Sequence, residues 1–219
     1  MSEVGIDDIA LHFPRLYFAM QDFAEFRGAD YGKLSKGLGL EAMAIPDVHE
    51  DTATMGANAV SRLIDRNSLD PSSIRRIYLG KESALEGAKP PATNIMDMLE
   101  QRYSPKFGEE CFRNCDVVDM TFACIGAVDA MHNTLDWVAR GGEDRNRIGI
   151  VVFADNAKYD LGSSGEYTQG AGGGAILIRH NPRLLAIPDI WGVSTMPVHD
   201  FFKPRREVET RTVVENVLE

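Results

Sequence analysis

Apolar positions along the chain repeat with two different periods, and these periods alternate from one segment to the next. Alternation, or a short apolar run between turn residues, predicts strands over residues 5–13, 74–79, 116–122, 148–154, 170–178 and 184–193. A period near 3.6 predicts helices over residues 17–27, 31–36, 52–67, 93–103 and from about 125 to 140. The last two strands should be antiparallel neighbours around Asn181-Pro182. Strands that alternate with helices predict an α/β layered domain, and 219 residues suffice for a buried core.

Bulk composition narrows the class of protein and its partners. Hydrophobic residues make up 44% and charged residues 26%, which is typical of a water-soluble protein. The formal net charge of −10 argues against nucleic acid and anionic membranes as partners. No apolar run approaches the length of a membrane span, and the acidic start, with Glu3, Asp7 and Asp8, does not resemble a signal peptide. We therefore expect a cytoplasmic protein.

The cysteines and histidines do not predict a disulfide framework or a metal site. The three cysteines are odd in number and sparse, which fits a reducing compartment. Cys111 and Cys115 have ligand-like spacing, but no second pair of Cys or His completes a zinc site, so two ordinary thiols are the better interpretation. None of the five histidines has metal-ligand spacing to another, and none is placed to serve as a general base for the third cysteine, Cys124.

Cys124 is the strongest candidate for chemistry. The apolar strand of residues 116–122 stops at Ala123-Cys124, and a helical pattern then continues to about Arg140. A cysteine at such a turn meets the amides and dipole of the helix start, which favour the thiolate that attacks thioesters. A free cysteine is often an inert core residue. Here the small neighbours Gly126 and Ala127 would let a substrate approach the sulfur, so the position favours acyl transfer.

Glu82 is the second candidate, because it closes a strand that should lie beside the Cys124 strand. The alternative is an exposed loop acid, and Glu86 one helical turn later fits that description better. The glycine-rich residues 162–174 lack the Lys-Ser/Thr pair of a phosphate loop and lead into a strand, so we do not expect a nucleotide site there. Their glycines indicate a close approach of the backbone either to an active centre or to a packed helix.

Several separate blocks, in order, resemble hydroxymethylglutaryl-CoA synthase of the thiolase superfamily. The resemblance runs from Gly5 to about Pro204, which corresponds to the first half of a typical family member. The matching blocks are Met55-Gly56-Ala57-Asn58-Ala59, Glu82-Ser83, Ala123-Cys124, Ala154-Asp155-Asn156-Ala157-Lys158-Tyr159, Thr168-Gln169-Gly170-Ala171-Gly172 and Asp200-Phe201-Phe202-Lys203-Pro204. Blocks that share order and spacing are far more specific than any one of them.

The resemblance implies a thiolase-like layered α/β fold, one half of a pseudo-duplicated structure, with a five-stranded mixed sheet flanked by helices. Residues 1–180 would form the N-terminal half, and residues 181–219 the last strand and the start of an inserted region. The implied reaction condenses acetyl-CoA with acetoacetyl-CoA and water to HMG-CoA and CoA. Cys124 would carry the acetyl group and Glu82 would remove a proton from its methyl. The residues implied to line or order the substrate pocket are Asp30, Asp155, Tyr159, Thr168 and Asp200.

The resemblance also implies partners. Coenzyme A thioesters are the substrates, and no separate cofactor or metal is expected. The family's catalytic His and its supporting Asn belong to the second half of the fold, so we expect a partner chain that carries this half, and a homo- or hetero-oligomer. Family members commonly carry Tyr where Ile125 stands and an acid where Phe122 stands, which predicts an altered rate or acceptor pocket.

Two alternatives stay open. The chain could be a non-catalytic scaffold or regulatory subunit of an acyl-CoA-handling complex, or a condensing enzyme like ketoacyl synthase III, which shares the cysteine turn but not the Glu82 block. The pathway, mevalonate and isoprenoid synthesis or specialised β-branching, also stays open.

Overall fold

The computed structural model describes residues 3–141 and 146–198 of the chain. The chain divides into two compact units, residues 1–188 and residues 189–219. All helices and strands of the described residues belong to the first unit, and the described part of the second, residues 189–198, has neither. The boundary that the resemblance implies, after residue 180, stays a prediction.

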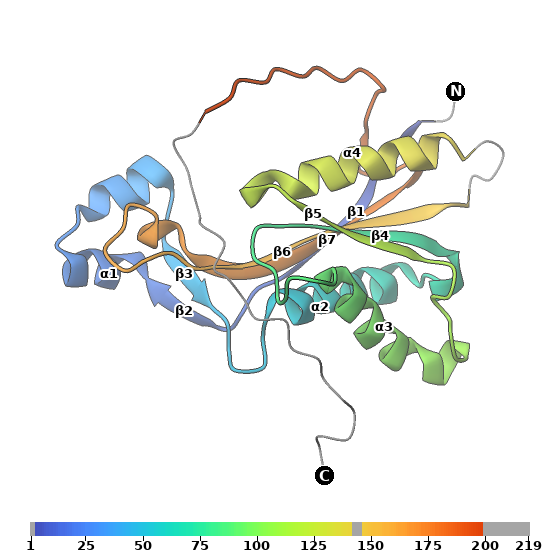
Figure 1. Cartoon of the computed structure of the whole chain (residues 1–219), viewed down its shortest axis with the longest axis horizontal. Coiled ribbons are helices and arrows are strands. Elements are labelled where there is room, and N and C mark those ends of the chain that lie inside the picture. Colours follow the sequence, from blue (N-terminus) through green and yellow to red (C-terminus); the bar gives the residue numbers. More distant parts are fainter. Residues whose placement is uncertain (1–2, 142–145, 199–219) are drawn as a thin grey trace, which may run out of the picture. The chain divides into compact units, whose positions relative to one another are not determined.

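A six-stranded mixed sheet forms the centre of the first unit (Figure 1). Its strand order is β5-β4-β6-β7-β1-β8. In chain order the strands are β1 Val4–His12, β4 Ile74–Lys81, β5 Asp116–Thr121, β6 Ile148–Ala157, β7 Gly170–His180 and β8 Leu185–Ala186. Strands β5, β4 and β6 are parallel, whereas β7 is antiparallel to β6 and β1 is antiparallel to β7. The carboxyl ends of β4, β5 and β6 therefore meet at one edge of the sheet.

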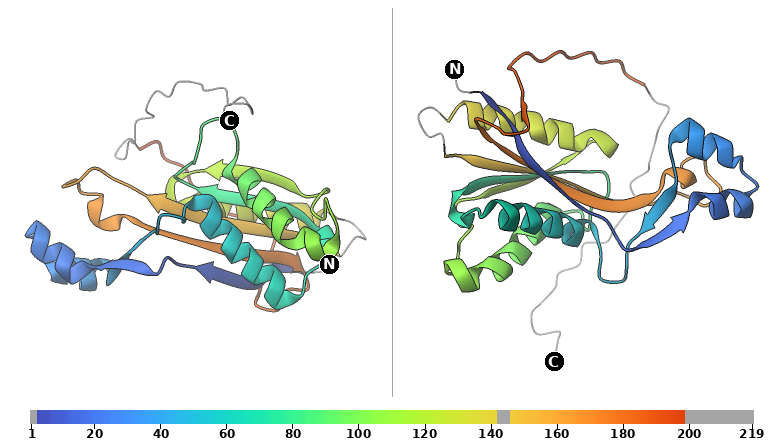
Figure 2. Two further views of the ribbon diagram at one scale, coloured as in Figure 1. Left: turned by 90° about the horizontal axis from the view of Figure 1, so that it is seen from below. Right: turned by 180° about the vertical axis from the view of Figure 1, so that it is seen from behind.

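Helices cover both faces of this sheet (Figure 2). Helices α2 (Thr52–Asn67) and α3 (Pro91–Phe107) enclose one core, and α4 (Gly126–Ala139) encloses the other. Neighbouring residues of β6 divide between them, since Val152 belongs to the first core and Val151 to the second. This division follows from the alternating direction of side chains along a strand. The predicted mixed sheet flanked by helices is confirmed, with β8 as a sixth strand of two residues.

Helix α2 has the bounds that its apolar period predicts, and its start is fixed by a capping box. The Asp51 carboxylate accepts the backbone N–H of Thr54 at 2.7 Å, and the Thr54 hydroxyl accepts the N–H of Asp51 at 2.7 Å. These bonds satisfy backbone groups that the first turn of a helix leaves without partners. The Thr52 hydroxyl of this first turn lies 3.3 Å from that of Ser83, at the carboxyl edge of the sheet.

The predicted helix over residues 17–27 is wrong at its start. Leu16–Ala19 is strand β2, which pairs antiparallel with β3 (Ala42–Ile45), and helix α1 covers Met20–Arg27. Strand β3 was not predicted at all. The helix expected at residues 31–36 is present, with a π-helical segment (η1) over Lys33–Gly37. Because all four residues of β2 are apolar, their spacing has no period, and the pairing with β3 decides the conformation.

The strand predicted over residues 184–193 is also wrong. Only Leu185–Ala186 pairs, and its neighbour is β1 rather than β7. The chain turns at Asn181, which has a φ of 52°, and thereby passes to the far side of β1. A turn of this kind fixes the direction of the chain but not the strand that it joins, so the pairing was not readable from the sequence.

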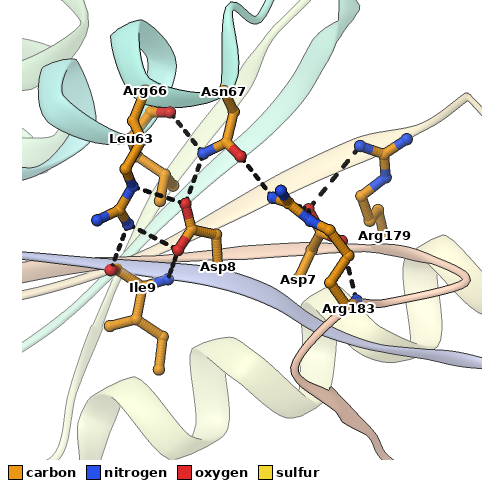
Figure 3. A network of polar contacts seen from close by, with 8 residues as sticks. All are labelled: Asp7, Asp8, Ile9, Leu63, Arg66, Asn67, Arg179 and Arg183. Atoms are coloured by element: carbon orange, nitrogen blue, oxygen red, sulfur yellow. Dashed lines mark hydrogen bonds and ion pairs between the residues drawn. The ribbon is translucent and has the colours of Figure 1, made fainter.

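A network of ion pairs ties the irregular part of β1 to α2 and to the turn after β7 (Figure 3). Asp7, only 2% exposed, accepts from the Arg183 guanidinium at 2.7 Å. Asp8 accepts from Arg66 at 2.7 and 2.8 Å and from Asn67 at 2.7 Å. Burial acts to raise the pKa of Asp8, but these donors and a backbone N–H outweigh it, so the pKa is lowered. The network thus holds β1 against α2 through charged groups.

The glycines at the start of β7 serve close packing. A Cβ on Gly173 would lie 2.9 Å from the backbone carbonyl carbon of Met55 in α2, and one on Gly174 would lie 2.1 Å from the Phe153 ring. Of the two interpretations that the sequence left open for this segment, packing against a helix is the one that Gly173 shows. Any side chain here would displace α2 or the neighbouring strand.

Two further glycines let α4 lie directly on the sheet. A Cβ on Gly80 of β4 would lie 2.0 Å from the backbone nitrogen of Ala127, and a Cβ on Gly126 would lie 2.6 Å from the carbonyl oxygen of Met120. Both contacts are with main-chain atoms, which cannot rotate away. The first turn of α4, and the residues before it, are therefore fixed over the ends of β4 and β5.

We expect Gly80→Ala to lower the free energy of unfolding by about 3 kcal/mol or more, because α4 must move to admit the methyl group. Urea denaturation measures this change. Gly87→Ala is the matched control: its Cβ would have no neighbouring heavy atom within 4 Å, so a change below about 0.5 kcal/mol is expected. Equal stability of the two variants would contradict the tight contact between α4 and β4.

Candidate functional site

Cys124 lies in a sharp turn between β5 and α4. Strand β5 ends at Thr121, Ala123 has a φ of 39°, and a 3-10 turn over Ala123–Ile125 leads into α4. A non-glycine residue in this left-handed region is uncommon and mildly strained, and the small side chain of Ala123 limits the strain. The turn leaves Cys124 exposed at the amino end of α4, over the carboxyl edge of the sheet.

Glu82 follows β4 directly and lies next to Cys124. Its Oε2 is 4.0 Å from Cys124 Sγ, and the phenolic oxygen of Tyr159 lies 3.1 and 3.2 Å from its two carboxylate oxygens. Three residues that the sequence proposed from separate segments are thus brought together. The parallel order of β5, β4 and β6 explains why, since each residue follows the carboxyl end of one of these strands.

Asp155, at the end of β6, anchors the main chain that carries Glu82. Its carboxylate accepts the backbone N–H of Glu82 at 2.9 Å and both the N–H and the hydroxyl of Ser83 at 2.7 Å. Burial raises the pKa of Asp155, and the hydrogen bonds act in the opposite direction without cancelling it. The Ser83 hydroxyl also accepts the N–H of Asn156 at 3.0 Å, which closes the link between β4 and β6.

Tyr159 remains a hydrogen-bond donor over a wide pH range. Burial, followed by the hydrogen bond to Glu82 and the charge of that carboxylate, raises the pKa of Tyr159 to about 12. A phenol at this position keeps its proton at physiological pH, so it donates a hydrogen bond to the Glu82 carboxylate without transferring the proton.

The loop after β6 is held by two residues, Gln169 and Glu166, to which the sequence assigned no role of their own. The Gln169 side chain accepts the backbone N–H of Tyr159 at 2.7 Å. Glu166, only 4% exposed, accepts the N–H of Gly162 at 2.8 Å and pairs with Arg27 of α1. These contacts hold the loop that carries Tyr159. An acid inside a glycine-rich segment is the one signal in the sequence that could have indicated Glu166.

The other predicted pocket residues form local hydrogen bonds. Asp30 is exposed, and its carboxylate accepts the N–H of Gly32 at 2.8 Å. Thr168 is also exposed and donates to the carbonyl oxygen of Gly165 at 2.8 Å. Asp200 lies outside the described residues. The substrate contacts expected of these three residues therefore stay predictions.

No group of three or more His, Cys, Asp and Glu residues within residues 3–141 and 146–198 is placed to hold a metal ion. Within the same ranges, no helix combines the length and the apolar character that crossing a bilayer requires.

The arrangement suits covalent catalysis followed by proton removal. An acyl group carried on Cys124 Sγ would place its α-carbon one bond beyond the thioester carbonyl, in the space next to the Glu82 carboxylate. The carboxylate could then remove an α-proton while the sulfur retains the acyl group. The geometry therefore fits an acyl-enzyme whose α-carbon can lose a proton to the neighbouring carboxylate.

Comparison with known proteins points to one family. Residues 1–182 match the family model for the N-terminal part of hydroxymethylglutaryl-coenzyme A synthase. The chain is 38% identical over 208 residues to the hydroxymethylglutaryl-CoA synthase of Haloferax volcanii, an alignment that covers 94% of this chain and 45% of the relative. It is 34% identical over 206 residues to hydroxymethylglutaryl-CoA synthase A of Dictyostelium discoideum, with 94% and 41% covered. The chain thus spans less than half the length of these relatives.

Solved structures give the same result. MvaS in complex with 3-hydroxy-3-methylglutaryl coenzyme A superposes with a TM-score of 0.82 at 34% identity, covering 93% of this chain and 46% of that one. An HMG-CoA synthase complexed with CoA superposes with a TM-score of 0.79 at 30% identity, covering 92% and 48%. The fold is the thiolase-like fold that the resemblance implied.

Thiol reactivity should separate Cys124 from the other cysteines. Burial, with the nearby Glu100 carboxylate, raises the pKa of Cys111 to about 11, and burial raises that of Cys115 to about 12. We expect iodoacetamide at neutral pH to alkylate the exposed Cys124 on the order of 10-fold faster than either, measured by peptide mass spectrometry. A Cys124→Ser control should stay almost unlabelled. Faster labelling of Cys111 or Cys115 would contradict the described burial.

Proposed function

Because the chain belongs to the hydroxymethylglutaryl-CoA synthase family, we propose that it supplies the nucleophile and the base of an acyltransferase that condenses acetyl-CoA with acetoacetyl-CoA. The observation that carries the proposal is the 4.0 Å separation of Cys124 Sγ and Glu82 Oε2 at the carboxyl edge of the sheet. The substrates are coenzyme A thioesters, and the chemistry needs no further cofactor.

In the first step the Cys124 sulfur attacks the thioester carbonyl of acetyl-CoA. The bond between the acetyl carbon and the CoA sulfur breaks, a bond to Sγ forms, and CoA leaves as the thiol with the proton that the cysteine gives up. Backbone N–H groups at the start of α4, that of Cys124 among them, would stabilise the oxyanion. The exposed position of Cys124 leaves room for the thioester to approach.

In the second step Glu82 acts as the general base. Its carboxylate takes a proton from the methyl group of acetyl-Cys124, and the resulting carbanion attacks the ketone carbon of acetoacetyl-CoA. The former ketone oxygen takes up a proton and becomes the 3-hydroxyl group. Water then cleaves the thioester bond between the condensed product and Cys124 Sγ, which restores the thiol and releases HMG-CoA with a free carboxyl group. The Tyr159 hydroxyl holds both carboxylate oxygens, and Asp155 holds the main chain of Glu82, so the base is fixed before substrate enters. Fixed geometry of this kind is a main source of catalytic rate.

The rest of the fold would complete the site. The chain spans less than half the length of its relatives, so a second half, joined to it or carried by a partner chain, would supply the catalytic His that polarises the acceptor thioester. Large apolar side chains around the nucleophile favour a covering partner: Phe122 is 63% exposed, Ile125 49% and Val128 38%. The exposed apolar side chains support a homo- or hetero-oligomer, and we propose a location in the cytoplasm. Asp30, Thr168 and Asp200 would complete the pocket.

The proposed reaction predicts an acetylated cysteine. In the complete assembly, acetyl-CoA should add one acetyl group to Cys124, and mass spectrometry of the cysteine peptide detects it. Glu82→Ala should keep this acetyl group but lower the rate of HMG-CoA formation by about 10²–10⁴-fold, because the base is lost. Glu86→Ala, a change at an exposed acid of the same loop, is the matched control and should leave both measurements unchanged.

The alternatives give different outcomes of this experiment. An unmodified thiol in the complete assembly would refute the synthase and favour a scaffold or regulatory subunit. Condensation that survives Glu82→Ala would favour an enzyme like ketoacyl synthase III instead.

Tyr159→Phe should lower the condensation rate by about 10-fold to 100-fold, since it removes the hydrogen bonds to an ionised carboxylate and keeps the ring. Steady-state assays of CoA release measure the effect. Tyr17→Phe, at a 68% exposed position on β2, is the control and should match the wild type. An unchanged rate in Tyr159→Phe would mean that the hydroxyl does not position the base.

A further inference from the structure

A buried ion pair joins the ends of β4 and β5, the two strands that lead to Glu82 and Cys124. Lys81, the last residue of β4, precedes Glu82, and its side chain is only 6% exposed. Its ammonium lies 3.5 Å from Asp119 Oδ2 and donates to the Thr121 hydroxyl at 2.9 Å. The sequence did not single out any of the three, because a lysine at the end of a strand normally reaches solvent.

The contacts join the strand of the base to the strand of the nucleophile. Lys81 and Thr121 are cross-strand partners at the last paired position of β4 and β5. Asp119 lies two residues before Thr121 and therefore on the same face of β5. Glu82 follows one member of this pairing directly, and Cys124 follows the other by three residues. The Lys81 side chain thus bridges the two strands at the point from which both reactive side chains are carried.

Asp119 extends the link to α3. Its Oδ1 accepts the N–H of Ala92, in the first turn of α3, at 3.1 Å. Its Oδ2 faces the Lys81 ammonium and has no hydrogen-bond donor among the described residues. Burial raises the pKa of Asp119, and the Ala92 N–H and Lys81 act against this rise. The strand ends and the helix are therefore joined through one carboxylate.

A buried ion pair usually adds little to the free energy of unfolding. Removing both charges from water costs free energy, and apolar residues of similar volume often stabilise a protein as well or better. An ion pair does, however, demand one geometry, because each charge must stay opposite its partner. At the end of two strands, this demand fixes their relative position where the hydrogen-bonded ladder stops.

We propose that Lys81 is a positioning residue, whose ammonium, held between Asp119 and Thr121, fixes the end of β4 against β5 and so keeps the Glu82 carboxylate beside Cys124 Sγ. The inference rests on the proposed function and deepens it. The turn at Ala123 and the main-chain contacts of Gly126 hold the nucleophile without the Lys81 ammonium. Loss of the ammonium should therefore impair proton removal from acetyl-Cys124 more than it impairs acetyl transfer.

The test separates these two steps in the complete assembly. Acetylation of Cys124 is followed by mass spectrometry, and proton removal is followed by the entry of deuterium from heavy water into the methyl group of acetyl-CoA. In Lys81→Met, the rate of deuterium entry relative to that of acetylation should fall on the order of 100-fold, the effect of a small misplacement of a reacting group. Lys106→Met, at an exposed lysine of α3, is the matched control and should keep the wild-type ratio.

A second variant guards against simple unfolding, because Lys81→Met leaves a buried Asp119 without its cation. In Lys81→Met/Asp119→Asn the charges are removed together. We expect its melting temperature to return toward the wild-type value while the exchange ratio stays low. Thr121→Val, which lacks the hydroxyl but keeps the shape, should also lower the ratio, and Thr121→Ser should restore it.

The outcomes are distinct. A wild-type ratio in the stable double variant, or in Thr121→Val, would overturn the positioning role and leave the proposed function intact. If the wild-type assembly acquires no acetyl group on Cys124, the proposed function fails and the positioning role with it.

Discussion

The contact of α4 with the main chain of β4 is the constraint on which the site depends. Gly80 and Gly126 bring the first turn of the helix onto the strand, closer than any side chain would allow. Cys124 belongs to the turn that enters this helix, and Glu82 leaves the same strand two residues after Gly80. Backbone packing therefore brings the turn of Cys124 and the end of β4 together, and the side chains of Lys81, Asp155 and Tyr159 then hold the Glu82 carboxylate in place.

Different polar contacts hold the main chain and the carboxylate of Glu82. Asp155 binds the backbone N–H of Glu82, and the neighbouring Ser83 adds two more donors to the same carboxylate. These bonds fix where the Glu82 side chain begins, and the Tyr159 hydroxyl fixes where its carboxylate ends. Because the raised pKa of Tyr159 keeps its hydroxyl protonated up to high pH, Tyr159 remains a neutral hydrogen-bond donor to the Glu82 carboxylate.

The sequence predicted those parts of the structure whose cause is local. Helix α2 has a clear apolar period and a capping box, and its bounds were correct. The proximity of Cys124 and Glu82 was also accessible, since parallel strands in an alternating pattern bring their carboxyl ends together. The sequence does not predict strands β2 and β8, because pairing with their partners, β3 and β1, decides their conformation. The role of Lys81 cannot be predicted from the sequence for a related reason, because its burial depends on Asp119 of the neighbouring strand.

This chain matches less than half the length of its relatives, and under the proposed function it also carries only part of the chemistry. Acetyl transfer needs a nucleophile and oxyanion donors, and proton removal needs a base beside the methyl group. This chain contains Cys124, the start of α4 and Glu82 within one rigid sheet edge. Attack on the acceptor needs a group that polarises a second thioester, and no described histidine lies in the cluster formed by Cys124, Glu82, Tyr159 and Asp155. Under the proposed function, the described residues would form and activate the acyl-enzyme, and the part of the fold that would cover Phe122, Ile125 and Val128 would recognise the acceptor.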